Sequence, residues 1–65
     1  MADADLDAAR RQFAELTGLF EDAAVIASAG QGVKTLDDGR RQFKRLSTAM
    51  HRIRRRLGIL EGRLQ

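Results

Sequence analysis

Residues 27–38 read ASAGQGVKTLDD and contain the one strong break in a chain that otherwise favours helix. Gly30 is predicted to take the left-handed conformation that often follows a helix end, because a side chain would clash there. Thr35 is predicted to cap the next helix, with Asp37 and Asp38 in its first turn near the positive end of the helix dipole. The chain therefore divides at this point into two helices.

Composition supports an all-α fold on both sides of the break. The 65 residues include no proline, tryptophan or tyrosine and only three phenylalanines, so strand and turn formers are scarce. We expect one domain over residues 1–65, with a helix at about 4–29, a loop at 30–34 and a helix at about 35–63. The first helix is expected to start at Asp3 or Asp5. A short loop requires the two helices to run antiparallel.

Apolar residues in both segments recur three and four residues apart, which is the spacing of a coiled-coil seam. The first segment has Leu6, Ala9, Phe13, Leu16, Phe20, Ala23 and Ala27, and the second has Leu36, Phe43, Leu46, Met50, Ile53, Leu57, Leu60 and Leu64. Gly39 occupies the one missing step of the second segment. Leu19 and Ile26 widen the first stripe beyond what one neighbouring helix can cover.

A chain this short has a marginal hydrophobic core unless something reinforces it. It has no cysteine for disulfides, and a metal site is not expected because His51 is the only histidine. Self-association remains, and we expect two hairpins to form a homodimeric four-helix bundle, with a tetramer also open. The residues expected to mediate it are Leu6, Phe13, Leu16, Leu19, Phe20, Ile26, Leu36, Phe43, Leu46, Met50, Ile53, Leu57 and Leu60.

The sequence also repeats itself after thirty residues. Residues 6–17 and residues 36–47 share the pattern Leu-Asp-x-x-Arg-Arg-Gln-Phe-x-x-Leu, followed by Thr17 or Ser47. A duplicated helix explains the match, and so does chance within a restricted heptad alphabet. Both explanations predict that Phe13 and Phe43 occupy equivalent positions.

Charge is divided unequally between the two halves. Residues 1–33 carry six acidic and two basic residues, whereas residues 34–65 carry ten basic and three acidic residues. The arginines of the second helix can bind phosphates, complement the acidic helix or only keep the surface solvated. The candidate nucleic-acid or acidic-partner face comprises Arg41, Lys44, Arg45, Arg52, Arg55 and Arg56. No aromatic residue is interleaved with these arginines, and no helix-turn-helix, zinc-finger or RNA-recognition signature occurs.

Ile59 and Leu64 are candidate contacts for another protein. Ile59 lies off the apolar stripe, and the end of the second helix is expected to run past the start of the first.

Neither catalysis nor a cofactor is expected. Ser47 lies one turn before His51, but no oriented nucleophile, base and carboxylate can be assembled around them. Residues 30–32, Gly-Gln-Gly, lack the strand and the GK[ST] sequence of a phosphate loop.

No apolar run is long enough to span a membrane, and the acidic N-terminus does not resemble a signal peptide. We therefore expect a cytoplasmic protein, and the abundance of Ala, Arg, Asp and Gly suggests a bacterial source. The favoured function is a non-enzymatic adaptor or regulator that binds itself and another protein. The alternative is a nucleic-acid-binding regulator that uses the arginine-rich face.

Overall fold

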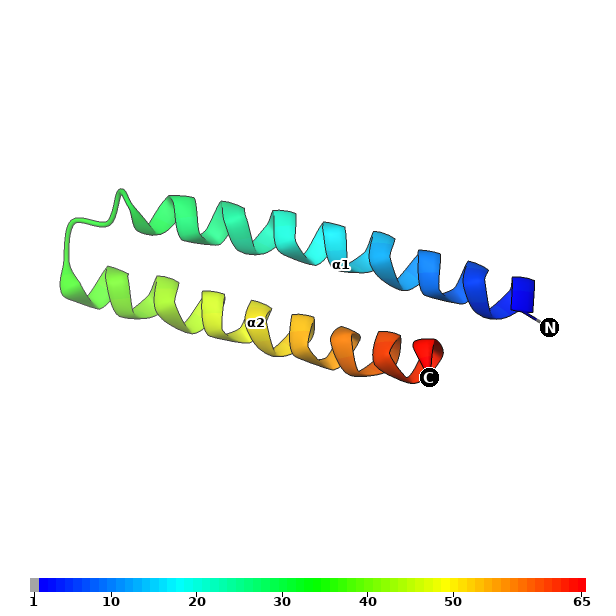
Figure 1. The fold of residues 1–65 in the computed structure, drawn as a ribbon. Coiled ribbons are helices and arrows are strands. Elements are labelled where there is room, and N and C mark those ends of the chain that lie inside the picture. The colour runs from blue at the N-terminus through cyan, green and yellow to red at the C-terminus, as the bar shows by residue number, and fades with distance from the viewer. Residues whose placement is uncertain (1) are drawn as a thin grey trace.

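The protein is a helical hairpin. A computed structural model describes the backbone of residues 2–65 and the side chains of residues 4–65. Helix α1 (Ala2–Gly30) and helix α2 (Leu36–Leu64) run antiparallel and lie side by side (Figure 1). The predicted all-α hairpin is confirmed. The predicted start of the first helix is wrong, because α1 already begins at Ala2 and so includes Asp3 and Asp5. An acidic residue is as favourable inside the first turn as before it.

The connection between the helices agrees with one prediction and corrects another. Thr35 is the N-cap of α2, with extended backbone angles, and its Oγ1 accepts a hydrogen bond of 3.1 Å from the amide of Asp38. Gly30 is the last residue of α1, and no described glycine has a positive φ. The helix instead tightens into successive turns, in which the amides of Gln31 and Gly32 each donate to the carbonyl three residues earlier. These turns satisfy the helix end without a left-handed residue.

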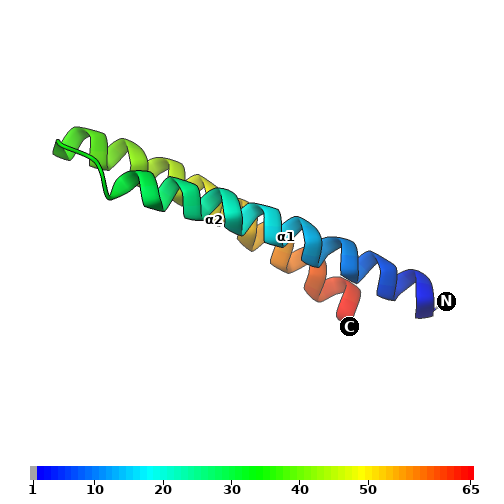
Figure 2. The ribbon, with the colours of Figure 1, turned by 90° about the horizontal axis from the view of Figure 1, so that it is seen from above.

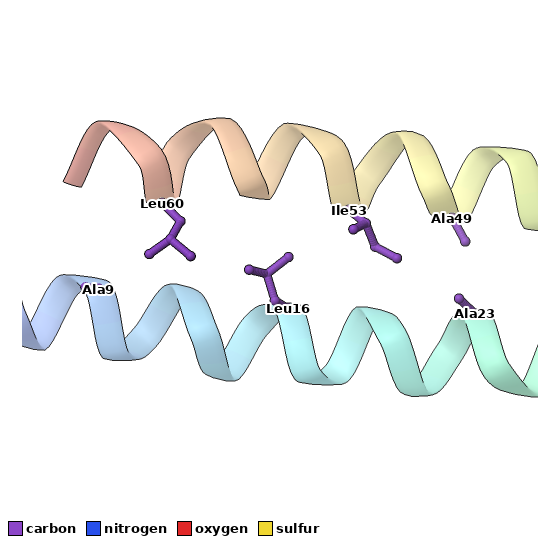
Figure 3. Close-up of a cluster of buried hydrophobic side chains, with 6 residues drawn as sticks. All are labelled: Ala9, Leu16, Ala23, Ala49, Ile53 and Leu60. Carbon is purple, nitrogen blue, oxygen red and sulfur yellow. The ribbon is translucent and has the colours of Figure 1, made fainter. Parts of the chain in front are cut away.

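The interior of the hairpin is thin. The buried residues are Ala9, Leu16 and Ala23 of α1 and Ala49, Ile53 and Leu60 of α2 (Figure 3). Ile53 is the most deeply buried, at 1% exposed, and Leu19, Ile26 and Leu46 pack against this group. Three of the six buried residues are alanines, so the helices bury little apolar volume between them.

The overall shape is that of a rod. The Cα radius of gyration is 15.4 Å, whereas a compact domain of this length would have about 11 Å. The helices cross over one another near their middles, as Figure 2 shows from above. Each helix has a single neighbour along its length, and the remainder of its circumference faces solvent.

The two open ends of the helices are not level. The first turn of α1 extends beyond the end of α2 in both views (Figures 1 and 2). The expectation that the second helix overhangs the first is therefore wrong. The two helices have 29 residues each, and α2 begins farther out at the loop end than α1 ends, so α1 extends farther at the open end (Figure 1). Across residues 2–65, neither helix combines the length and the hydropathy that crossing a membrane requires.

Candidate interaction surfaces

The structure divides the predicted apolar stripe into two columns. One column, with Leu16 and Ile53 at its centre, is buried between α1 and α2. The other column, which includes Phe13 and Phe43, is exposed on the hairpin. The cause is geometric, because two helices bury a narrow seam and an apolar stripe about 100° wide exceeds it.

The exposed column forms what we call the apolar face. Its members are Leu6, Phe13, Phe20, Leu36, Phe43, Met50, Leu57 and Leu64, and their exposed fractions range from 41% to 79%. Within each helix these residues recur every seven residues. Each lies four residues after a position of the buried column and is therefore about 40° round the helix from it. In an antiparallel pair, these flanks of the two helices lie on the same side. Consistent with this geometry, Ala27 of α1 and Phe43 of α2 line one shared hollow.

Contacts between the helices set the register of the apolar face. Arg56 Nη1 lies 2.6 Å from Glu15 Oε2, and Gln42 Nε2 donates a hydrogen bond of 3.2 Å to the Ile26 carbonyl. In this register the exposed apolar residues of α1 and α2 run in opposite order along the same side of the hairpin, and Ala27 and Phe43 share one hollow near the loop end.

The apolar face is large for a chain of this size. Taking about 200 Å² for each side chain, its eight residues expose roughly 900 Å². The largest apolar patch on a typical monomer is about 300–600 Å². One side of a standard protein interface buries about 800 Å². The face therefore has the area of an interface.

The opposite side of the hairpin carries a second feature, which we call the basic groove. It consists of hollows between α1 and α2 at the loop end, at the middle and at the open end. The cationic side chains lining them are Arg11, Lys34, Arg41, Arg45, Arg52, Arg55, Arg56 and Arg63. The acidic side chains are Glu15, Asp22 and Asp38. The groove is therefore strongly positive.

Few of these cations are neutralised. Arg56 pairs with Glu15 across the helices, and Arg41 pairs with Asp38 at 3.4 Å within α2. Within residues 4–65, no ion pair involves Arg45, Arg52 or Arg55. Charge complementarity between the acidic and basic helices accounts for one contact, and most of the arginines remain available.

Five of the six residues predicted for the nucleic-acid or acidic-partner face lie in the basic groove. Arg41, Arg45, Arg52, Arg55 and Arg56 all line the basic groove. Lys44 belongs to the outer side of α2 and lines none of these hollows.

The two candidate partner contacts also separate. Ile59, 44% exposed, lies in the middle hollow of the groove together with Leu19. Leu64, the last residue of α2, belongs to the apolar face and is 64% exposed. The structure thus assigns one contact to each surface.

Three polar residues of the hairpin seam were missed by sequence reasoning. Gln12 and Gln42 are partly buried and Arg56 is half-buried, and all three share a column with Leu19, Ile26 and Ala49. The signal was the position of these residues, each three or four residues from a buried residue of the same helix or from Leu46, which packs against the core. It was hidden because long polar side chains can bury their stems while their heads reach water.

The thirty-residue repeat has a structural counterpart. Phe13 and Phe43 occupy equivalent positions on the apolar face, which confirms the predicted phase. Gln12 and Gln42 are equivalent in the seam, although Gln42 makes a hydrogen bond and the buried Oε1 of Gln12 has no partner. Duplication itself stays a prediction.

His51 and Ser47 make no hydrogen bond to each other in the described part of the chain, residues 4–65. His51 is exposed on the outer side of α2, away from both surfaces.

Comparison with known proteins adds no family to this description. No family model matches the chain, and neither the curated proteins nor the solved structures include a significant match.

Proposed function

We propose that this protein is a non-enzymatic interaction protein, an adaptor or small regulator, that works as a homodimeric four-helix bundle. The observation that carries the proposal is the apolar face, because roughly 900 Å² of apolar side chain would otherwise remain in water. A second copy is the occupant whose shape matches. Its own face presents the same apolar residues at the same seven-residue spacing, and a two-fold axis is the commonest way to close such a contact.

The bundle also accounts for the predicted stripe. In a four-helix bundle each helix contacts two neighbours, so its buried sector must include both the hairpin seam and the column beside it. Leu16 and Phe20 belong to these two columns of α1, and Ile53 and Leu57 belong to those of α2. The stripe read from the sequence is centred between the columns, where the axis of a bundle would lie.

The test is the molar mass in solution. Size-exclusion chromatography with light scattering, run over a series of protein concentrations, should give twice the chain mass of 7.2 kDa. Far-ultraviolet circular dichroism on the same samples should show helix. A folded, helical monomer at high micromolar concentration would contradict the proposal, and four times the chain mass would replace the dimer with a tetramer.

A nucleic-acid-binding regulator is the second candidate function. The observation in its favour is the set of arginines without ion-pair partners, Arg45, Arg52 and Arg55, along one groove. Binding of this kind is dominated by counterion release and weakens steeply with salt. Fluorescence anisotropy of labelled duplex DNA and structured RNA, titrated at two salt concentrations, tests it. Tight, salt-sensitive binding would support this function, and no binding at low salt would exclude it.

A further inference from the structure

The middle of the basic groove combines charge with an apolar floor. Arg52, Arg55 and Arg56 line a hollow of about 270 Å³ together with the apolar side chains of Leu19 and Ile59, which we call its apolar floor. Sites for small molecules usually enclose about 300–1,000 Å³. This hollow is smaller and open to solvent, so it suits one inserted side chain better than a whole ligand.

The groove continues on both sides of this hollow. Lys34, Arg41 and Arg45 line its loop end, and Arg11 and Arg63 line its open end. Glu15, which pairs with Arg56, and Asp22 line part of the α1 side, but a ligand lying along the groove meets a net positive charge over most of the length of the hairpin. Such a surface selects an elongated, acidic ligand.

The α1 side of the groove has small residues that leave room for a helical ligand. Gly18 borders the middle region, and a Cβ added there would meet no atom within 4 Å. Ala8 and Ala29 line the hollows towards the two ends. Because these residues are small, their side chains do not project far from α1, and a helix can lie along the groove over α1 and α2.

We propose that the basic groove docks an acidic amphipathic helix of a partner protein, with one apolar side chain of that helix seated on Leu19 and Ile59. The inference names the partner of the proposed interaction protein and so rests on that function, although it does not require the dimer. The apolar face and the groove lie on opposite sides of the hairpin, so a bundle closed through the apolar faces leaves one groove open on each outer side.

The position of the phenylalanines favours a protein ligand over a nucleic acid. Phe13, Phe20 and Phe43 all belong to the apolar face, so the groove has no ring on which a base can stack. Phosphate groups also make no use of Leu19 and Ile59. An acidic helix uses both the arginines and the apolar floor.

The probes are labelled peptides of about 20 residues, long enough for several helical turns. The first is glutamate-rich with leucines at helical spacing on one face. The second has the same charge and alanines in place of the leucines, and a labelled DNA duplex is the third probe. Anisotropy titrations with the full chain should show that the leucine peptide binds, and binds more tightly than the other two probes.

Substitutions in the basic groove test whether the leucine peptide binds there. Arg52→Gln combined with Arg55→Gln should weaken binding of the leucine peptide about tenfold, because two exposed charge contacts are lost. Ile59→Ala should weaken it several-fold. The matched control, Lys44→Gln combined with Arg54→Gln, removes the same charge from outside the groove and should change binding by less than about twofold.

Results that refute helix docking in the groove can be distinguished from results that refute the dimer. Equal binding of the alanine peptide or the DNA, an equal effect of the control variant, or no binding at all would each overturn the inference. Light scattering on the same samples reports the dimer separately. A dimer that does not bind refutes the groove and leaves the bundle standing, whereas a monomer that binds refutes the bundle and leaves the groove standing.

Discussion

Phe20→Ala is expected to weaken assembly without lowering the helix propensity of α1. Phe20 is 51% exposed in the hairpin and belongs to the apolar face. Alanine is a better helix former than phenylalanine, so the helix itself does not suffer. What is lost is the burial that Phe20 would gain against a second copy.

The magnitude follows from the area. The exposed half of a phenylalanine side chain is roughly 100 Å², which at about 25 cal/mol per Å² corresponds to about 2.5 kcal/mol. A symmetric dimer loses this twice, or about 5 kcal/mol, so its dissociation constant should rise by about three to four orders of magnitude.

Sedimentation equilibrium over a dilution series measures the dissociation constants of the wild type and the variant. The control is Val25→Ala, because Val25 is 70% exposed but lies on the outer side of α1, about 140° round the helix from Phe20. It should leave the dissociation constant within a few-fold. Equal effects of the two substitutions, or a Phe20→Ala variant that associates as tightly as the wild type, would refute the role of the apolar face.

Further predictions concern the hairpin itself, and each is measured by thermal or urea unfolding followed by circular dichroism. Ile53→Ala, at the most buried position, should destabilise the protein by about 2–5 kcal/mol, and a loss below about 1 kcal/mol would show that the helices do not pack here. Thr35→Ala removes the N-cap of α2 and should lower the free energy of unfolding by about 1 kcal/mol, whereas Thr35→Ser should leave it nearly unchanged. Gln12→Leu removes a buried oxygen for which residues 4–65 provide no hydrogen-bond partner, and it should raise the free energy of unfolding by about 1 kcal/mol. A lower unfolding midpoint would mean that water or Arg63 donates a hydrogen bond to this oxygen.

Much of the fold could be predicted from local chemistry. The break near Gly30, the cap at Thr35 and the antiparallel pairing depend on residues close in sequence or on loop length, and all three are found. The form of the break differs, because Gly30 continues the helix and right-handed turns complete it. Such turns satisfy the helix end as well as a left-handed glycine does, so the sequence does not distinguish them.

The assignment of columns could not be predicted in the same way. The apolar stripe shows which side of each helix avoids water. Which part of the stripe is buried within the hairpin depends on how the neighbouring helix packs against it. Gln12, Gln42 and Arg56 obscured the hairpin seam because their polar ends suggest a surface position. The two-sided arrangement of apolar face and basic groove appears only once the seam is placed.

The alanine-rich interior of the hairpin has a consequence for how the protein is controlled. A pair of helices that buries only Ala9, Ala23 and Ala49 beside three larger residues gains little from folding alone. If the second copy supplies the remaining stability, the folded fraction depends on how much chain the cell contains. In that case isolated chains below a threshold abundance would be unfolded and exposed to proteases, and pairing above it would protect them. The amount of protein made would then set the fraction that is folded.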